Sequence, residues 1–165
     1  MLLPGARDRT VIVTATDFAA MDNYLASNSF FRNGVDQNIK RRLTLNFLYY
    51  TGMTIGEILA VRYQDIISSC EAASYAQTAF SGYQIQVSGT TDTGFIIGLD
   101  GAKKSKLCLV SMPEPLAAIF FRDKEQHLSD DGNMEDLIFS FTHGTIIEML
   151  RKLSPQLGID KRIVC

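Results

Sequence analysis

The segment between Gln37 and Ile66 constrains the fold more than any other part of the chain. Its first run, Gln37 to Tyr50, is apolar almost all round in its second half, and Gly52 follows as a helix stop. A helix with apolar residues on every side must be enclosed by other elements. Thr54 and Glu57 then have the spacing of a capping box, which predicts a second helix directly after the first. We therefore expect a globular domain packed around two consecutive helices.

Other segments also have helical patterns. Thr14 to Leu25 combines capping residues with apolar side chains that recur every three or four positions. Pro113 to Phe120 begins with prolines, which the first turn of a helix tolerates, and Thr142 to Leu153 is amphipathic. His127 falls near the end of the Pro-led helix, where the helix dipole favours its protonated form. Asn28 to Asp36 is predicted to be a loop.

The middle of the chain changes to a period of two. Tyr83 to Val87 alternates apolar and polar residues, as a half-buried strand does. Phe95 to Leu99 and Lys106 to Met112 are predicted to be two more strands, joined through Asp100-Gly101 in a hairpin. We therefore predict an α+β fold, mainly helical, with a small three-stranded antiparallel sheet. Because the sequence has no repeats or low-complexity linker, residues 1–165 are expected to form a single domain.

Charge limits the kinds of partner that the chain can bind. The formal net charge is -2, whereas a protein that binds nucleic acid by itself usually carries a net positive charge. Contact with DNA would therefore depend on local basic patches. The basic runs of the chain are Lys40-Arg41-Arg42, the lysines at 103, 104 and 106, Arg151-Lys152 and Lys161-Arg162, and such runs are usually solvated faces.

Membrane insertion and metal binding are not expected. Polar residues interrupt the longest apolar stretches before they reach the roughly 20 residues of a membrane span. The apolar stretch at the start is too short for a signal peptide, so we expect a cytoplasmic protein. Cys70, Cys108 and Cys165 lie far apart without Cys-x-x-Cys spacing, and only His127 and His143 accompany them. We predict no metal and no cofactor.

One stretch matches a known catalytic motif in its order of residue types. From Leu45 to Ile66 the sequence contains an apolar helix, Thr51-Gly52, a second apolar helix with Glu57 near its start, and an ending of an aromatic residue followed by Asp65-Ile66. This order resembles the first catalytic box of tyrosine recombinases, the phage-integrase family. In that family the first catalytic arginine would stand where this chain has Thr54.

Two further stretches carry the resemblance through about residues 10 to 163. Lys103 to Leu116 looks like the family's hairpin, whose turn carries a catalytic lysine and whose last strand leads into a Pro-led helix. That lysine would be Lys103 or Lys104. Leu157 to Ile163 resembles the segment that precedes the second box. The resemblance thus implies a partial recombinase catalytic domain.

The resemblance also implies a function connected with site-specific DNA recombination and integration, as in mobile elements. The family's chemistry needs a positively charged cradle, because an attacked phosphodiester gains negative charge on its oxygens. Its lysine acts as the general acid for the leaving oxygen. The family's His-x-x-Arg box and tyrosine nucleophile have no counterpart in these 165 residues. We therefore expect a truncated domain that does not cleave DNA, and whether it is an enzyme stays open.

The resemblance assigns roles to individual residues. Lys103 or Lys104 would be catalytic, and Thr54 would occupy the position of the missing arginine. Glu57 and Asp65 would support the structure of the first box. Weak contacts with duplex DNA are expected from the basic side chains Arg41, Arg42, Lys103, Lys104 and Lys106. On the residues alone, Thr54 is more simply the N-cap of a helix that begins with Glu57 in its first turn.

Two expectations concern partners. Truncation would expose the apolar faces at 47–50 and 146–153, so we predict a homo-oligomer. An alternative function also stays open, in which a non-catalytic interaction or regulatory module reuses the recombinase scaffold. Salt-dependent DNA binding separates this alternative from the recombinase-like function.

Overall fold

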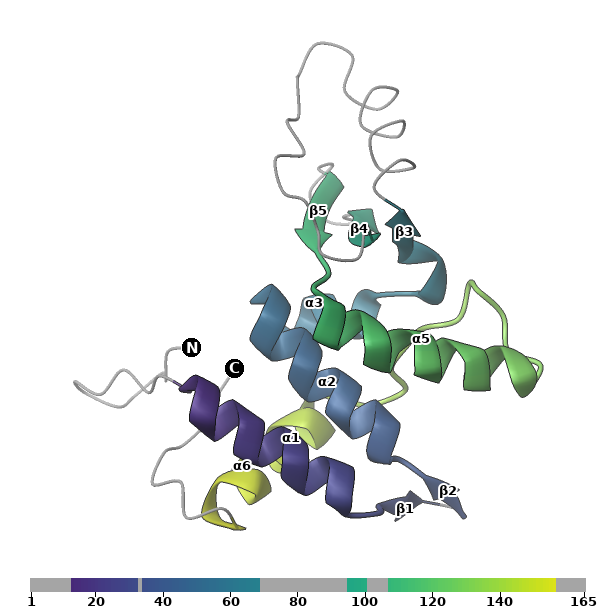
Figure 1. The fold of residues 1–165 in the computed structure, drawn as a ribbon. Helices are drawn as coiled ribbons and strands as arrows, with labels where there is room; N and C mark the ends of the chain where they lie inside the picture. The colour runs from purple at the N-terminus through teal and green to yellow at the C-terminus, as the bar shows by residue number, and fades with distance from the viewer. Residues whose placement is uncertain (1–12, 33, 69–94, 101–106, 157–165) are drawn as a thin grey trace. The chain divides into compact units, whose positions relative to one another are not determined.

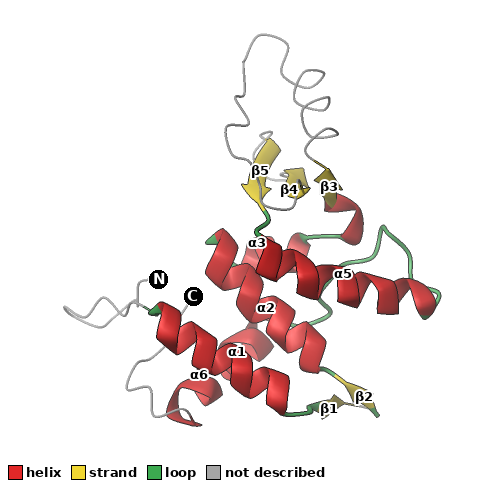
Figure 2. Cartoon of the chain, viewed as in Figure 1, coloured by secondary structure: helices red, strands yellow, loops and turns green. Residues whose placement is uncertain are grey.

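The computed structural model describes residues 13–32, 34–68, 95–100 and 107–156 (Figure 1). Most of the described elements are helices, and the strands are short (Figure 2). The chain divides into two compact units, one of Met1–Ala60 with Phe139–Cys165 and the other of Val61–Ile138. Each unit is described by itself, and the single domain expected from the sequence stays a prediction.

Four helices are described in the first unit, and the predicted helix start at Thr14 and helix stop at Gly52 are confirmed. Its helices are α1 (Ala15–Ser27), α2 (Asn38–Thr51), α3 (Ile55–Ala60) and α6 (His143–Gln156). At the start of α1, the Thr14 hydroxyl accepts a hydrogen bond from the Asp17 amide at 3.1 Å. The Asp17 carboxylate accepts one from the Thr14 amide at 3.0 Å, which completes a capping box. Gly52 ends α2 in the left-handed conformation, with φ of 65°.

The core of the first unit joins all four helices. It consists of buried apolar side chains at helical spacing, namely Phe18, Met21, Leu25, Leu45, Ile55, Ile146, Met149, Leu150 and Leu153. The prediction that the faces at 47–50 and 146–153 are exposed is therefore wrong for Phe47 and for the buried residues of α6. Since those side chains are buried within this chain, they give no reason for self-association. A homo-oligomer stays a prediction.

A hairpin occupies the place of the predicted loop between α1 and α2. The two short strands, β1 (Phe31–Arg32) and β2 (Val35–Asp36), pair antiparallel. Gly34 lies between them with φ of 79°, a conformation that glycine adopts without a steric penalty. The loop prediction is wrong because the strands are too short to carry an alternating pattern.

The second unit contains a three-stranded antiparallel sheet in the order β3-β4-β5. Two strands, β4 (Phe95–Asp100) and β5 (Leu107–Ser111), fall on segments predicted to be strands. The predicted strand Tyr83 to Val87 lies outside the described residues. The edge partner of β4 is instead β3 (Ile66–Ser68), with Ile66 opposite Ile97.

The helix that follows the capping box of Thr54 and Glu57 is short, because tertiary pairing competes for the residues after it. The helix α3 stops at Ala60, and the Ile138 amide donates to the Val61 carbonyl at 3.0 Å. Arg62 forms an isolated antiparallel bridge with Leu137. The chain then makes a single turn, η1 (Tyr63–Asp65), and enters the sheet at β3.

The long helix of the second unit, α5 (Glu114–Ser129), begins as predicted. Pro113 is its N-cap and Pro115 lies in its first turn, where a missing amide hydrogen costs nothing. Leu116, Ala117 and Phe120 are buried. No helix in the described part of the chain is both long and apolar enough to span a membrane.

Candidate functional site

Thr54 caps the helix α3. Its hydroxyl accepts a hydrogen bond from the Glu57 amide at 3.3 Å. In return, the Glu57 carboxylate accepts from the Thr54 amide at 2.8 Å and from the Thr54 hydroxyl at 3.1 Å. Both residues are exposed. A cap of this kind stabilises a protein by about 1 kcal/mol. The residue at the position where the resemblance places an arginine therefore has a structural role at the start of α3.

Asp65 has a comparable backbone role at the next turn. Its carboxylate accepts a hydrogen bond from the Arg62 amide at 2.7 Å and so closes η1. The Arg62 guanidinium donates to the Glu135 carbonyl. Glu57 and Asp65 therefore hold the backbone at the start and after the end of α3. The supporting role in the first box that the resemblance implies for them stays a prediction, as does any role toward DNA.

Arg42 lies in a paired and partly buried position. Its guanidinium makes two contacts with the Asp22 carboxylate, from Nη2 at 2.8 Å and from Nε at 3.1 Å. The buried Asn46 amide donates to the same carboxylate at 2.9 Å. The hydrogen bond to Asp22 raises the pKa of Arg42. This cluster joins α1 to α2, and it occupies the fork that a phosphate would need.

Arg41 has a different environment. Its guanidinium carbon lies 4.2 Å from the centre of the Phe30 ring, in a cation–π arrangement. Partial burial lowers the pKa of Arg41. Of the two arginines predicted to bind DNA, Arg41 is thus the one whose charge is not matched by a carboxylate among the described residues. Lys103, Lys104 and Lys106 lie outside the described residues.

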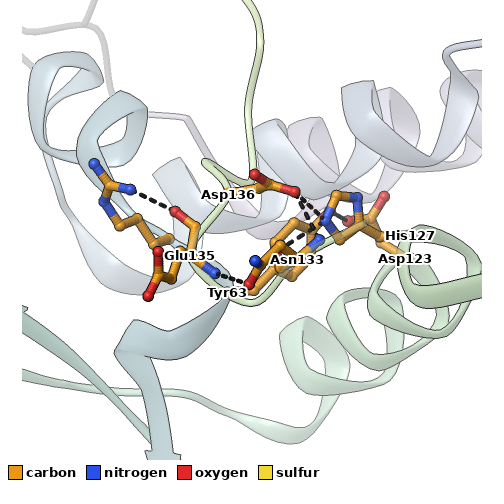
Figure 3. A network of polar contacts seen from close by, with 7 residues as sticks. Tyr63, Asp123, His127, Asn133, Glu135 and Asp136 are labelled. Atoms are coloured by element: carbon orange, nitrogen blue, oxygen red, sulfur yellow. Dashed lines mark hydrogen bonds and ion pairs between the residues drawn. The ribbon is translucent and has the colours of Figure 1, made fainter. Parts of the chain in front are cut away.

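A polar network in the second unit surrounds the buried Tyr63 (Figure 3). The Tyr63 hydroxyl donates to the Asp123 carboxylate at 2.6 Å, and the two side chains come from η1 and α5. Tyr63 is 0% exposed and Asp123 is 5% exposed. Burial, followed by the bond to Asp123, raises the pKa of Tyr63. A hydroxyl that is buried, hydrogen-bonded and harder to ionise is poorly suited to act as a nucleophile, and these features favour a structural role for Tyr63.

His127 extends this network to the loop after α5. Its ring stacks on Tyr63, with 4.2 Å between ring centres and 11° between planes. Its Nε2 lies 3.1 Å from the Asn133 carbonyl and 3.1 Å from the Asp136 carboxylate, so Nε2 carries a hydrogen and donates. The backbone amide of Asn133 donates to the same Asp136 carboxylate oxygen at 2.7 Å. The network fastens the loop to the end of α5.

The sequence pattern does not predict this network, although His127 lies near the end of its helix as expected. One local feature of the sequence bears on it. Asp131-Gly132-Asn133 has the composition of a tight turn, which predicts that the chain reverses direction after the helix that contains His127. The pairing of Tyr63 with Asp123 has no local signal. Within the described ranges, no three His, Cys, Asp or Glu side chains are grouped so that they could hold a metal ion.

Comparisons with known proteins bear on the fold. No protein-family model and no curated protein sequence matches the chain. Among solved structures, the chain is similar to the crystal structure of XerA recombinase, with a TM-score of 0.63 and 18% sequence identity. The match covers 95% of this chain and 47% of that chain, so this chain spans about half the length of XerA recombinase. The chain therefore has a recombinase-like fold.

Proposed function

We propose that the chain is a DNA-binding domain of the tyrosine-recombinase type, connected with site-specific recombination or integration, in which the position of the first arginine carries no charge. The observation that carries this proposal is the agreement of two independent likenesses. The sequence from Leu45 to Ile66 resembles the family's first box, and the fold is similar to that of XerA recombinase.

The hydrogen bonds of Thr54 support the proposal that the position of the first catalytic arginine offers no positive charge to DNA. A family arginine would offer a charged, forked donor to a phosphate oxygen, whereas threonine offers one neutral hydroxyl. In this chain that hydroxyl donates to the Glu57 carboxylate at 3.1 Å. A phosphate would have to compete with this bond and would meet a nearby negative charge. The loss of one donor to a developing oxyanion costs about two to three powers of ten in rate.

The tyrosines also favour binding over cleavage. The last of them in these 165 residues is Tyr83, ahead of the segment that resembles the approach to the second box. Tyr63 is buried with a raised pKa, and Tyr49 stacks on Phe18 with 3.9 Å between ring centres. We infer that this chain by itself holds DNA without forming a covalent bond to it.

A titration of a fluorescent duplex at several salt concentrations tests the proposal. The logarithm of the binding constant should fall linearly with the logarithm of the salt concentration, because lysine and arginine release counterions from the phosphates. Absence of binding at low salt would contradict the proposal. That result would favour the alternative function, a protein-interaction or regulatory module on the same scaffold. The net charge of -2 and the occupied fork of Arg42 are the observations in favour of this alternative.

A further inference from the structure

The hairpin between α1 and α2 presents an unusually exposed aromatic ring. The side chain of Phe31 is 70% exposed, more than any other large apolar side chain among the described residues. Its neighbour Phe30 is half-buried and packs against the core of the first unit. Adjacent phenylalanines thus have opposite environments, one anchoring the hairpin and the other facing solvent.

The base of this hairpin is held firmly by hydrogen bonds. The Asp36 carboxylate accepts from the Phe30 amide at 3.0 Å and from the Asn38 amide at 2.9 Å. The Gln37 amide donates to the Phe30 carbonyl at 2.6 Å. Phe30 also lies against Tyr24, with 6.4 Å between ring centres. Because these hydrogen bonds fix the hairpin base, the backbone that carries Phe31 is held in place before binding, which lowers the entropic cost of binding.

The charges around the ring identify the kind of partner. Arg32 follows Phe31 and is exposed, and the Arg41 guanidinium covers the Phe30 ring at the hairpin base. Neither arginine forms an ion pair with a carboxylate in the described part of the chain. The one acidic side chain of the hairpin, Asp36, is occupied by two backbone amides. An exposed ring next to the exposed Arg32, with Arg41 at the base of the same hairpin, matches a polyanion that also offers flat apolar faces, which describes a nucleic acid with an accessible base.

We propose that the hairpin binds DNA at an unstacked base, where Phe31 stacks on the base and Arg32 and Arg41 contact flanking phosphates. This inference rests on the proposed function and adds the recognition of deformed or unpaired DNA to it. Stacking of an aromatic side chain on a base tolerates any sequence, since every base has a π face. The hairpin would therefore recognise the state of the duplex instead of its sequence.

The test uses two fluorescent duplexes of the same sequence, one fully paired and one with a single bulged base. The wild-type chain should bind the bulged duplex about tenfold more tightly, as one stacked base contributes in single-strand binders. Phe31→Ala should abolish this preference and keep the affinity for the paired duplex, whereas Phe31→Trp should retain the preference. Arg32→Ala should lower the salt slope for both duplexes by about 1.

Leu128→Ala is the matched control, because it removes another exposed apolar side chain from the other unit. It should leave the preference unchanged, and the unfolding midpoints of all variants should stay close to that of the wild type. Salt-dependent binding of both duplexes with equal affinity by the wild type would overturn this inference alone. Failure to bind either duplex would overturn the proposed function as well. A change of oligomeric state in Phe31→Ala would assign the ring to a second copy of the chain and so contradict the inference.

Discussion

The Tyr63 hydroxyl donates a 2.6 Å hydrogen bond to the Asp123 carboxylate, and both side chains are buried. Tyr63→Phe removes this hydrogen-bond donor from a buried carboxylate of the second unit. We expect a loss of about 1–3 kcal/mol in the free energy of unfolding. Tyr49→Phe is the control, because that side chain is 38% exposed and its change should cost no more than about 0.5 kcal/mol. Denaturant titrations of the three proteins measure this difference, and equal losses would contradict the role of the bond.

The same bond predicts a dependence on pH. Burial and the bond to Asp123 raise the pKa of Tyr63 above its ordinary value of 10.0. Since the folded-state pKa lies above the unfolded one, the stabilisation is complete below about pH 10 and is lost as the pH rises further. The difference in stability between the wild type and Tyr63→Phe should therefore shrink above that pH. A difference that stays constant into the alkaline range would count against the bond as its cause.

Gly132 lies where a side chain would strike the His127 ring. A Cβ atom at this position would be 2.3 Å from the ring atoms Cε1 and Nε2. Gly132→Ala should displace the ring from Tyr63, Asn133 and Asp136, and reduce the free energy of unfolding by about 1–3 kcal/mol. The control is Gly144→Ala, where the added Cβ would lie 3.9 Å from Thr142 Oγ1, an ordinary van der Waals contact. This helical variant should be as stable as the wild type or slightly more so, and equal effects of the two changes would be inconsistent with a close approach at Gly132.

We expect the Arg42 side chain to contribute mainly to folding stability, and not to DNA binding. Arg42→Ala leaves the Asp22 carboxylate without its two charged hydrogen bonds and should cost about 1.5–3 kcal/mol. Asp22→Asn should weaken the same cluster. Lys152→Ala provides the comparison, since its pair with Glu148 is exposed and should contribute at most about 0.5 kcal/mol. Thermal unfolding compares the three variants, and a fully stable Arg42→Ala would instead favour a role for this side chain in contact with DNA.

Much of the fold follows from short-range signals. The capping box of Thr14 and Asp17, the helix stop at Gly52 and the entry at Pro113 depend only on neighbouring residues, so the sequence reveals them. The end of α3 does not, because Val61 pairs with Ile138 far along the chain. The strand at Ile66 has the same origin, since its partner Ile97 lies beyond a long connection.

The candidate site divides in the same way. The cap formed by Thr54 and Glu57 is local and was predicted as such. The engagement of Arg42 by Asp22 joins two helices, and a basic run in the sequence does not show which of its members has a partner. The stack of His127 on Tyr63 likewise depends on where η1 meets α5. Pairings between distant elements need the tertiary structure.

Thr54→Arg tests whether position 54 corresponds to the position of the first catalytic arginine in the first box. The change removes the cap, so the free energy of unfolding should fall by about 1 kcal/mol. It also adds a phosphate contact, so the affinity for duplex DNA should rise and the salt slope should increase by about 1. Thr54→Ala is the matched control, because it loses the cap without a gain in charge. A covalent adduct between DNA and any of these proteins would contradict the proposed lack of a nucleophile.

The salt dependence of duplex binding, measured with and without the lysines at 103 and 104, tests the central claim most directly. Lys103→Ala combined with Lys104→Ala should weaken binding about uniformly across unrelated duplexes and lower the salt slope by roughly 2, for two lost phosphate contacts. Arg151→Ala with Lys152→Ala makes the same change in charge at exposed positions of α6 and should leave the slope unchanged. Equal slopes for the wild type and the Lys103/Lys104 variant, or no binding by the wild type at low salt, would contradict a recombinase-like DNA-binding domain.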